Sequence, residues 1–190
     1  MRPDFITVVT GIPRSGTSLL MQMLVAGGLE ALTDGQRVAD VHNPRGYYEL
    51  EAVKRTRRDA SWLRDAPGRV VKVIHALVPV LPAGHAYRLL LVERDLGEVI
   101  ASQASMLEGA APDALPDARL AQVFAAQLDE LRAWSRSRGV PLHTLRHEAL
   151  LRAPREAADG LARFLELDLD LDAMAGAVAP ALHRQRARAS

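Results

Sequence analysis

Residues 11–18, GIPRSGTS, gather two glycines, an arginine and three hydroxyl side chains into one short stretch. Gly11 and Gly16 have the spacing of the glycines in a phosphate-binding loop, G-x-x-x-x-G-K-[ST], and Ser18 supplies the hydroxyl that ends this motif. A turn of this kind before a helix points unpaired backbone N–H groups and the positive end of the helix dipole at one position. The stretch therefore predicts an anion site suited to phosphate.

The loop departs from the nucleoside triphosphatase pattern at its lysine. Thr17 stands where that lysine belongs, and the cation is Arg14, inside the loop. An arginine grips two phosphate oxygens bidentately, and the Thr17 and Ser18 hydroxyls donate hydrogen bonds to others. A triphosphate–magnesium complex bound here would lack the lysine ammonium that normally contacts its β- and γ-phosphates. We therefore expect a smaller anion, bound without a metal ion.

The elements that must hold this loop are a strand before it and a helix after it. Residues 5–9 are aromatic and β-branched, as in a buried strand, and apolar residues recur at helical spacing over 19–24. Further strands are predicted at 70–74, 88–92 and 142–145. Further helices are predicted at 51–64, 96–107, 118–138, 154–166 and 171–178. This alternation predicts an α/β fold of three layers (αβα) around a central, mainly parallel sheet, like that of P-loop nucleoside triphosphatases.

The motif PRSGTS after a strand resembles the 5′-phosphosulfate loop of sulfotransferases that use 3′-phosphoadenosine 5′-phosphosulfate. A second signature of that family is a strand ending in an arginine, with a serine eight positions later on the next helix. The run RLLLVERDLGEVIASQ places Arg94 and Ser102 in this pattern. The resemblance implies that these two residues bind the 3′-phosphate of the nucleotide. It also implies a set of residues at the 5′ end: Pro13, Arg14, Ser15, Gly16, Thr17 and Ser18.

Two features nearer the C-terminus bear on the nucleotide. Residues 142–166 resemble a strand, turn and helix of the family, with His147 where a tyrosine of the adenine-holding region usually falls. The other interpretation is that His147 only caps a helix or lies on the surface. Many cytosolic members also have a C-terminal Arg-Lys-Gly element over the 3′-phosphate, which this chain lacks. Arg184 or Arg186 would be its substitute.

The activity that the resemblance implies is transfer of a sulfuryl group to a hydroxyl or amine. Such a transfer needs a cation at the bridging oxygen and a base for the proton of the acceptor. Arg14 has the position of the family's electrostatic residue. His75, after Lys72, resembles the base of the Lys-x-His pair in cytosolic members, but two residues separate them here. On an ideal strand they would lie on opposite faces, so they share a site only if the strand bulges or ends before His75.

Glu49 is the second candidate for the base. The run HNPRGYYELE resembles a loop of bacterial sulfotransferase-like proteins, and more distant members of the superfamily use a glutamate as base. The neighbouring Tyr47 and Tyr48 would bury the Glu49 carboxylate, or would line the acceptor pocket. The alternative is that Glu49 and Glu51 simply favour the start of the next helix through its dipole.

The chain has 190 residues, of which 48% are hydrophobic and 25% charged, a composition typical of a globular protein. We therefore expect residues 1–190 to form one domain, with a flexible tail from about residue 183. A net charge of +1 gives no field that recruits nucleic acid. The absence of cysteine excludes disulfides and thiolate metal sites. No run reaches the ~20 apolar residues of a membrane span, and no signal peptide is recognised. We expect a cytoplasmic protein without a bound metal, acting on a small-molecule, glycan or peptide acceptor.

Two other functions fit parts of the pattern. A small P-loop phosphotransferase would need Mg²⁺ and a lysine on the phosphates, and Thr17 argues against it. A catalytically silent nucleotide-binding protein would keep the loop and lack the base.

Overall fold

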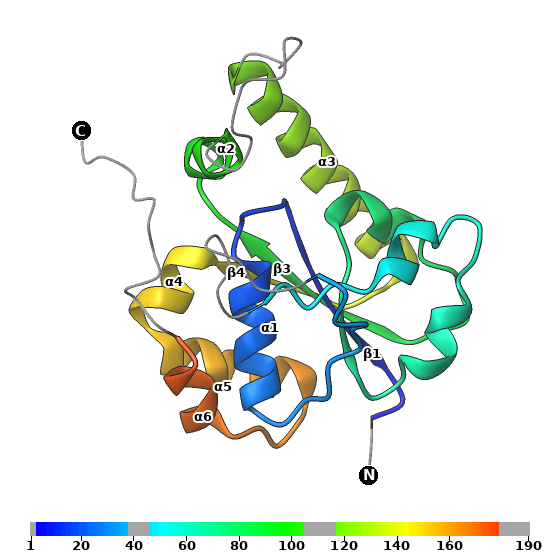
Figure 1. Cartoon of the computed structure of the whole chain (residues 1–190), viewed down its shortest axis with the longest axis vertical. Coiled ribbons are helices and arrows are strands. Elements are labelled where there is room, and N and C mark those ends of the chain that lie inside the picture. Colours follow the sequence, from blue (N-terminus) through cyan, green and yellow to red (C-terminus); the bar gives the residue numbers. More distant parts are fainter. Residues whose placement is uncertain (1–2, 38–45, 105–116, 179–190) are drawn as a thin grey trace.

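A four-stranded parallel sheet forms the centre of the computed structural model, which describes residues 3–37, 46–104 and 117–178 (Figure 1). The strand order is β2-β1-β3-β4. The strands are β1 (Ile6–Gly11), β2 (Val70–Lys72), β3 (Tyr87–Glu93) and β4 (Leu142–Arg146). Because all of them run parallel, their carboxyl ends meet at one edge, where open α/β sheets bind ligands. The expected α/β fold with a parallel central sheet is confirmed.

Helices cover both faces of the sheet, which gives the three predicted layers. One face is covered by α1 (Thr17–Ala26), α4 (His147–Arg152), α5 (Pro154–Leu165) and α6 (Leu171–Gly176) (Figure 1). The other is covered by α3 (Asp117–Arg138) and three 3₁₀ helices, η1 (Glu51–Arg55), η2 (Ser61–Asp65) and η3 (His75–Val80). Neighbouring residues of β1 serve opposite faces, Val8 packing with Leu131 of α3 and Val9 with Leu20 of α1. Burial on both sides explains why β1 and β3 are almost continuously apolar.

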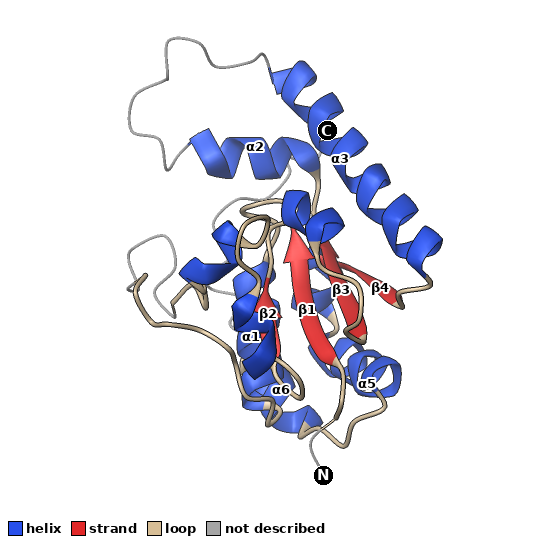
Figure 2. Cartoon of the chain, turned by 90° about the vertical axis from the view of Figure 1, so that its right-hand side faces the viewer, coloured by secondary structure: helices blue, strands red, loops and turns tan. Residues whose placement is uncertain are grey.

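Helix α2 and part of α3 extend beyond the sheet. Figure 2 shows α2 (Leu96–Ala104) and the first half of α3 beyond the carboxyl ends of β1 and β3. The buried residues of α3 are Leu128, Leu131 and Ser135, all in its second half. Arg132 of that half forms an ion pair with Glu93 at the end of β3. The core thus anchors one end of α3 and leaves the other end above the edge where β1 enters its loop.

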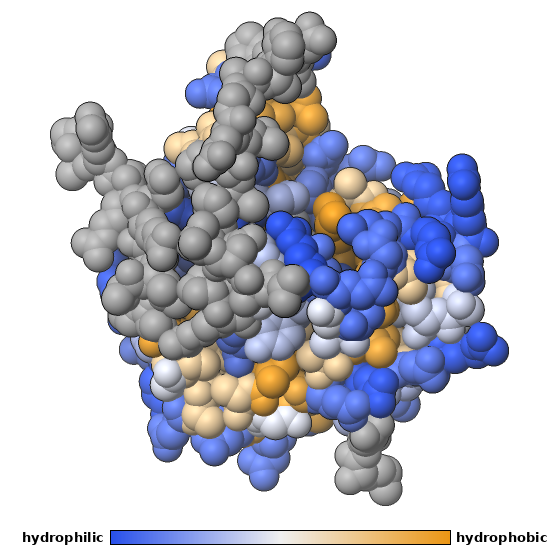
Figure 3. Space-filling model, viewed as in Figure 1, coloured by the Kyte–Doolittle hydropathy of each residue, from blue (hydrophilic) through white to orange (hydrophobic). Residues whose placement is uncertain are grey.

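The helix predicted at 51–64 is wrong. Two short 3₁₀ helices occupy this stretch, because the Trp62 indole donates to Thr56 Oγ1 (3.0 Å) and that hydroxyl donates to the carbonyl of Val53 (2.6 Å), folding the chain back on itself. The outer surface here is hydrophilic (Figure 3). Its exposed cations are Lys54, Arg55, Arg57, Arg58 and Arg64.

Other boundaries differ less. The strand predicted at 70–74 ends at Lys72, and the helix predicted at 118–138 spans Asp117–Arg138. The loop expected at 109–116 and the basic tail with Arg184 and Arg186 lie outside the described residues. No helix in the described part is long and apolar enough to cross a membrane.

Candidate active site

The loop between β1 and α1 is a tight turn that leads into the N-terminus of α1. The N–H of Ser15 donates to the carbonyl of Ile12 (2.9 Å), and Arg14 has a φ of 79°, in the left-handed region. Gly16 is the N-cap of α1. Within the described residues, no acceptor takes up the N–H groups of Gly16, Thr17 or Ser18. These are the donors that a helix N-terminus offers to an anion.

Close packing around the loop requires both of its glycines. A Cβ at Gly11 would lie 2.5 Å from Ser15 Oγ and 2.7 Å from the carbonyl oxygen of Val92. A Cβ at Gly16 would lie 2.4 Å from Cδ2 of His147. The Ser15 hydroxyl is buried and finds no hydrogen-bond partner among the described residues, which costs about 1–3 kcal/mol unless a ligand satisfies it. An orphaned donor beside free N–H groups fits an anion-binding loop.

Helix α2 packs on this loop and brings the two sequence motifs together. Arg14 Nε donates to Ser102 Oγ (3.0 Å), and Arg94 Nη1 donates to the carbonyl of Arg14 (3.3 Å). Gln103, which the sequence did not single out, donates to the carbonyl of Pro13 (2.9 Å). The structure therefore places Arg14, Arg94 and Ser102 at one site, although 80 or more residues separate the loop from the other two in the chain.

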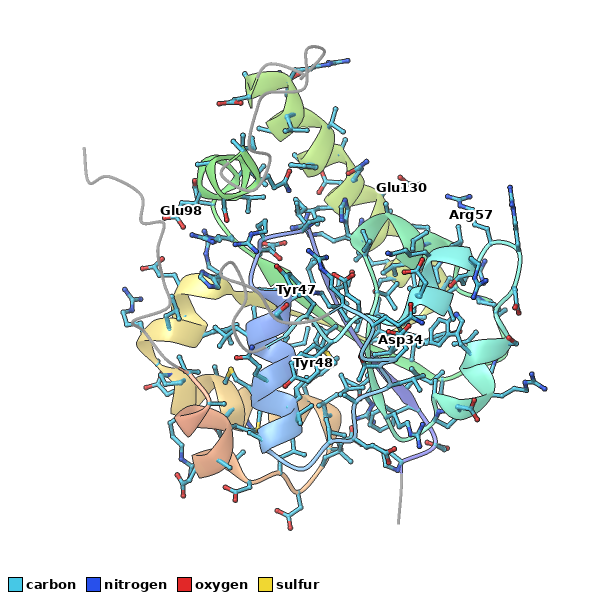
Figure 4. The ribbon with its side chains drawn as sticks, in the orientation of Figure 1. Asp34, Tyr47, Tyr48, Arg57, Glu98 and Glu130 are labelled. Atoms are coloured by element: carbon cyan, nitrogen blue, oxygen red, sulfur yellow. The ribbon has the colours of Figure 1, made fainter. Side chains whose placement is uncertain are left out.

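The charge of Arg94 is balanced by the carboxylate of Glu98, on α2. Its Nε lies 2.7 Å from Oε2 of Glu98, and the two side chains are only 9% and 15% exposed. Figure 4 labels Glu98 on this side of the molecule. The i,i+4 spacing of the pair was visible in the sequence and is the signal that would have identified Glu98.

Lys72 supplies the cation that the loop lacks at position 17. Its Nζ donates to Ser18 Oγ and to the carbonyl of Tyr47, both at 3.1 Å. Burial lowers the pKa of Lys72 to about 8; the Arg37 and Arg14 charges lower it as well, and Glu49 acts in the opposite sense. Lys72 is therefore an ammonium group at the first turn of α1 that is close to losing its proton at neutral to mildly alkaline pH.

Glu49 lies between two cations. Its Oε1 is 2.6 Å from Nη1 of Arg37 and 3.9 Å from Nζ of Lys72. The Arg37 guanidinium also stacks on the ring of Tyr47, 3.6 Å from its centroid, and Tyr47 is buried. Tyr48 packs against the core beside α1, and Figure 4 shows both tyrosines near that helix. The glutamate is thus a member of an ion cluster beside the loop.

Hydrogen bonds between two separate stretches hold Glu49 in place. Thr33 Oγ1 donates to the carbonyl of Glu49 (2.7 Å), and Asp34 Oδ2 accepts from the N–H of Glu51 (2.6 Å). The backbone N–H of Glu51, together with that of Gln36, donates to the Asp34 carboxylate and lowers the pKa of Asp34. Glu51 itself lies in the first turn of η1 and pairs with Lys54 (2.7 Å).

His75 reaches the loop because β2 ends before it. The ring is 4% exposed, with Nδ1 3.2 Å from the carbonyl oxygen of Gly11 and Nε2 2.8 Å from Oε1 of Gln127. A carbonyl only accepts, so Nδ1 carries a proton. Lys72 and His75 therefore both contact the β1–α1 connection, which one continuous strand would not allow. Ile74, between them, is the exposed large hydrophobic residue of the described chain, at 40%.

His147 begins α4, and its buried ring lies against Gly16. It is therefore not a surface histidine, and its ring forms part of the wall behind the loop.

Gly16→Ala is expected to destabilise the fold by roughly 2–4 kcal/mol, combining the cost of a positive φ with a clash against His147. Chemical denaturation measures this difference. Gly35→Ala is the matched control, because Gly35 also has positive φ (66°) but nothing lies within 4 Å of its added Cβ. A loss at Gly16 no larger than that at Gly35 would rule out the packing contact.

Among residues 3–37, 46–104 and 117–178, no group of three His, Cys, Asp or Glu side chains is placed to hold a metal ion.

No family model and no curated protein matches the chain. One solved structure that is similar is a sulfotransferase domain from the curacin biosynthetic pathway, with 18% identity and a TM-score of 0.49. The alignment covers 88% of this chain and 75% of that one.

Proposed function

We propose that the protein is a sulfotransferase that moves a sulfuryl group from 3′-phosphoadenosine 5′-phosphosulfate to a hydroxyl or amine of an acceptor. The observation that carries the proposal is the convergence of Arg14, Lys72 and Arg94 on one loop, each from a different element. A loop with its own arginine and a lysine from the neighbouring strand suits an anion held by protein charges. A cytoplasmic location of the protein would be in keeping with the absence of cysteine.

Each part of the nucleotide has candidate partners. The N–H groups of residues 16–18, the hydroxyls of Ser15 and Ser18 and the ammonium of Lys72 would hold the 5′ end. Arg94 and Ser102 would hold the 3′-phosphate. The donor, when bound, supplies a sulfuryl group on a phosphosulfate anhydride. Arg14 lies in the loop and donates to Ser102, and its permanent charge would stabilise negative charge on the bridging oxygen.

We assign the base to His75 and give Glu49 a different role. The Nδ1–H of His75 is held by the carbonyl of Gly11, which leaves Nε2 to take a proton. The Oε1 of Glu49 is occupied by Arg37 and faces Lys72, so Glu49 serves as the counter-ion that keeps Lys72 charged. The acceptor would enter beside His75 and the exposed Ile74.

Transfer of labelled sulfate tests the proposal directly. The purified protein is incubated with ³⁵S-labelled donor and a panel of alcohols, phenols, amines, glycans and peptides, and in parallel with ATP, Mg²⁺ and the same panel. We expect labelled product with the sulfate donor and none with ATP. Phosphate transfer from ATP without sulfate transfer would support the phosphotransferase alternative, and binding without any transfer would support a silent nucleotide-binding protein.

Binding of 3′,5′-diphosphoadenosine, the desulfated product, is expected to take up a fraction of a proton near pH 8. The pKa of Lys72 is about 8 in the free protein, and a phosphate beside its ammonium group raises that pKa, so the neutral fraction is protonated on binding. The affinity should accordingly fall as the pH rises above 8. Calorimetry in two buffers of different ionisation enthalpy measures the uptake. In Lys72→Arg, which stays charged, the uptake should vanish; an unchanged uptake would assign it to another group.

Arg94→Ala is expected to reduce the preference for a 3′-phosphorylated nucleotide by about 10- to 100-fold, on the scale of 1.5–3 kcal/mol for a charge-assisted hydrogen bond. The measurement compares the Kd of adenosine 5′-phosphosulfate with that of its 3′-phosphorylated form. Glu98→Gln is the companion variant, because it removes the carboxylate that neutralises Arg94 and should keep or increase the preference. An unchanged ratio in Arg94→Ala would place the 3′-phosphate elsewhere.

A further inference from the structure

Gln127 is a polar residue on the apolar stripe of α3, between Phe124 and Leu131. Its carboxamide contacts the buried ring of His75, with Oε1 2.8 Å from Nε2. We propose that Gln127 is a positioning residue that holds the His75 ring between turnovers, yields Nε2 to the acceptor hydroxyl, and receives the Nε2–H after proton transfer. This inference rests on the proposed function and adds to it a residue from α3, outside both sequence motifs.

The hydrogen-bond partners of His75 explain why a carboxamide suits this place. The carbonyl of Gly11 fixes the proton on Nδ1, so only Nε2 changes between a lone pair and an N–H. In the structure the amide presents Oε1 to Nε2, which is the orientation that accepts from an Nε2–H. Half a turn of the amide presents its NH₂ group instead, which donates to the Nε2 lone pair of the neutral ring. Neither leucine nor glutamate can serve both states. Gln127 is partly exposed, which leaves room for the amide to turn and move aside.

Uncharged groups surround the imidazole. Phe124 meets it edge to face, with ring centroids 6.3 Å apart, and the histidine is 4% exposed. Within the described residues, the hydrogen bonds and ring contacts of His75 are those with Gly11, Phe124 and Gln127. Two ionisable groups on neighbouring elements have partners elsewhere: Lys72 of β2 bonds Ser18 and Tyr47, and Asp129 of α3 pairs with Arg132. Gln127 is therefore the side chain best placed to decide which form of Nε2 is favoured.

The O–H bond of the acceptor breaks and its proton moves to Nε2 of His75, while the acceptor oxygen forms a bond to sulfur. The bond between sulfur and the bridging oxygen breaks, and its electron pair remains on the phosphate of the leaving nucleotide. After the product departs, the amide of Gln127 accepts from Nε2–H until the proton passes to water. The ring thus keeps one orientation through the cycle.

The test compares Gln127→Glu with Gln127→Leu, both close to glutamine in size. A glutamate accepts but cannot donate, so it favours the protonated ring, and the acid limb of the pH–rate profile should move up by about one pH unit or more. A leucine removes the acceptor of Nε2–H, so the limb should move down and kcat should fall about 10-fold. Gln122→Glu is the matched control, because it adds the same charge to an exposed position of α3. Acid limbs unchanged in both Gln127 variants would overturn the proposal.

A second readout separates this inference from the proposed function. Proton and carbon NMR follow the His75 ring as the pH changes, with His75→Asn identifying its signals, and they need no activity. A ring titration that shifts upward in Gln127→Glu but not in Gln122→Glu supports the pairing, even if no sulfate transfer is found. Sulfate transfer together with a His75 titration that ignores Gln127 would defeat the inference and leave the proposed function standing. Melting temperatures close to that of the unaltered protein confirm that each variant is folded.

Discussion

Arg14→Ala is expected to lower turnover by about 10²–10³-fold, the effect of losing one preorganised group at a developing charge. The affinity for the intact donor, 3′-phosphoadenosine 5′-phosphosulfate, should fall much less, because the charge that Arg14 stabilises builds up on the bridging oxygen only as the bond to sulfur breaks. The structure supports this role by anchoring the Arg14 backbone to Arg94 and its Nε to Ser102, inside the loop. Single-turnover transfer of labelled sulfate, with calorimetry of the intact donor in the absence of an acceptor, measures both quantities.

Two further variants give the Arg14 experiment its controls. Arg14→Lys keeps the charge but not the planar guanidinium, so its loss should be intermediate. Arg57→Ala removes an exposed arginine that points away from the loop (Figure 4) and should leave turnover unchanged. If Arg14→Ala weakens binding and turnover by the same factor, Arg14 contributes to binding alone.

His75→Asn is expected to lower turnover by about 10²–10⁴-fold, the usual contribution of a general base, and to remove the acid limb of the pH–rate profile. Asparagine is chosen because its amide can still donate to the carbonyl of Gly11, where Nδ1–H donates now. Unchanged binding of 3′,5′-diphosphoadenosine shows that the loop is intact in the variant.

Glu49→Gln separates the two candidate bases. Since Glu49 faces Lys72 and pairs with Arg37, losing its charge should weaken nucleotide binding at pH 8 and above and leave the acid limb in place. An acid limb that disappears in Glu49→Gln and persists in His75→Asn would make Glu49 the base and reverse the assignment.

The loop and its two flanking elements were predictable because their signals are local. The apolar run of β1, the glycines and the helical spacing of α1 all lie within about 20 residues, and so do the end of β3, Arg94 and the start of α2. Such features follow from backbone sterics and burial in a short stretch of chain. The division of 51–64 into η1 and η2 was not predictable in this way, since it depends on the Trp62–Thr56 bond, which no periodicity encodes.

The role of Lys72 depended on strand order, which the sequence does not contain. Because β2 lies next to β1 with Val9 opposite Lys72, the ammonium comes within reach of Ser18. The cation missing at Thr17 is thus restored by a strand more than fifty residues away. Arg37 and Gln127 were missed for the same reason, as their partners Glu49 and His75 are distant in the chain. Of these two residues, only Gln127 gave a signal in the sequence, because it is a polar residue on an otherwise apolar stripe of a helix.

Calorimetric titration of 3′,5′-diphosphoadenosine in the presence of EDTA tests most directly whether the loop holds a nucleotide by protein charges alone. We predict one binding site per chain, an affinity that added Mg²⁺ does not change, and weaker binding of adenosine 5′-monophosphate, which lacks the 3′-phosphate. Absence of binding under these conditions, together with saturable binding of ATP–Mg²⁺, would contradict the central claim.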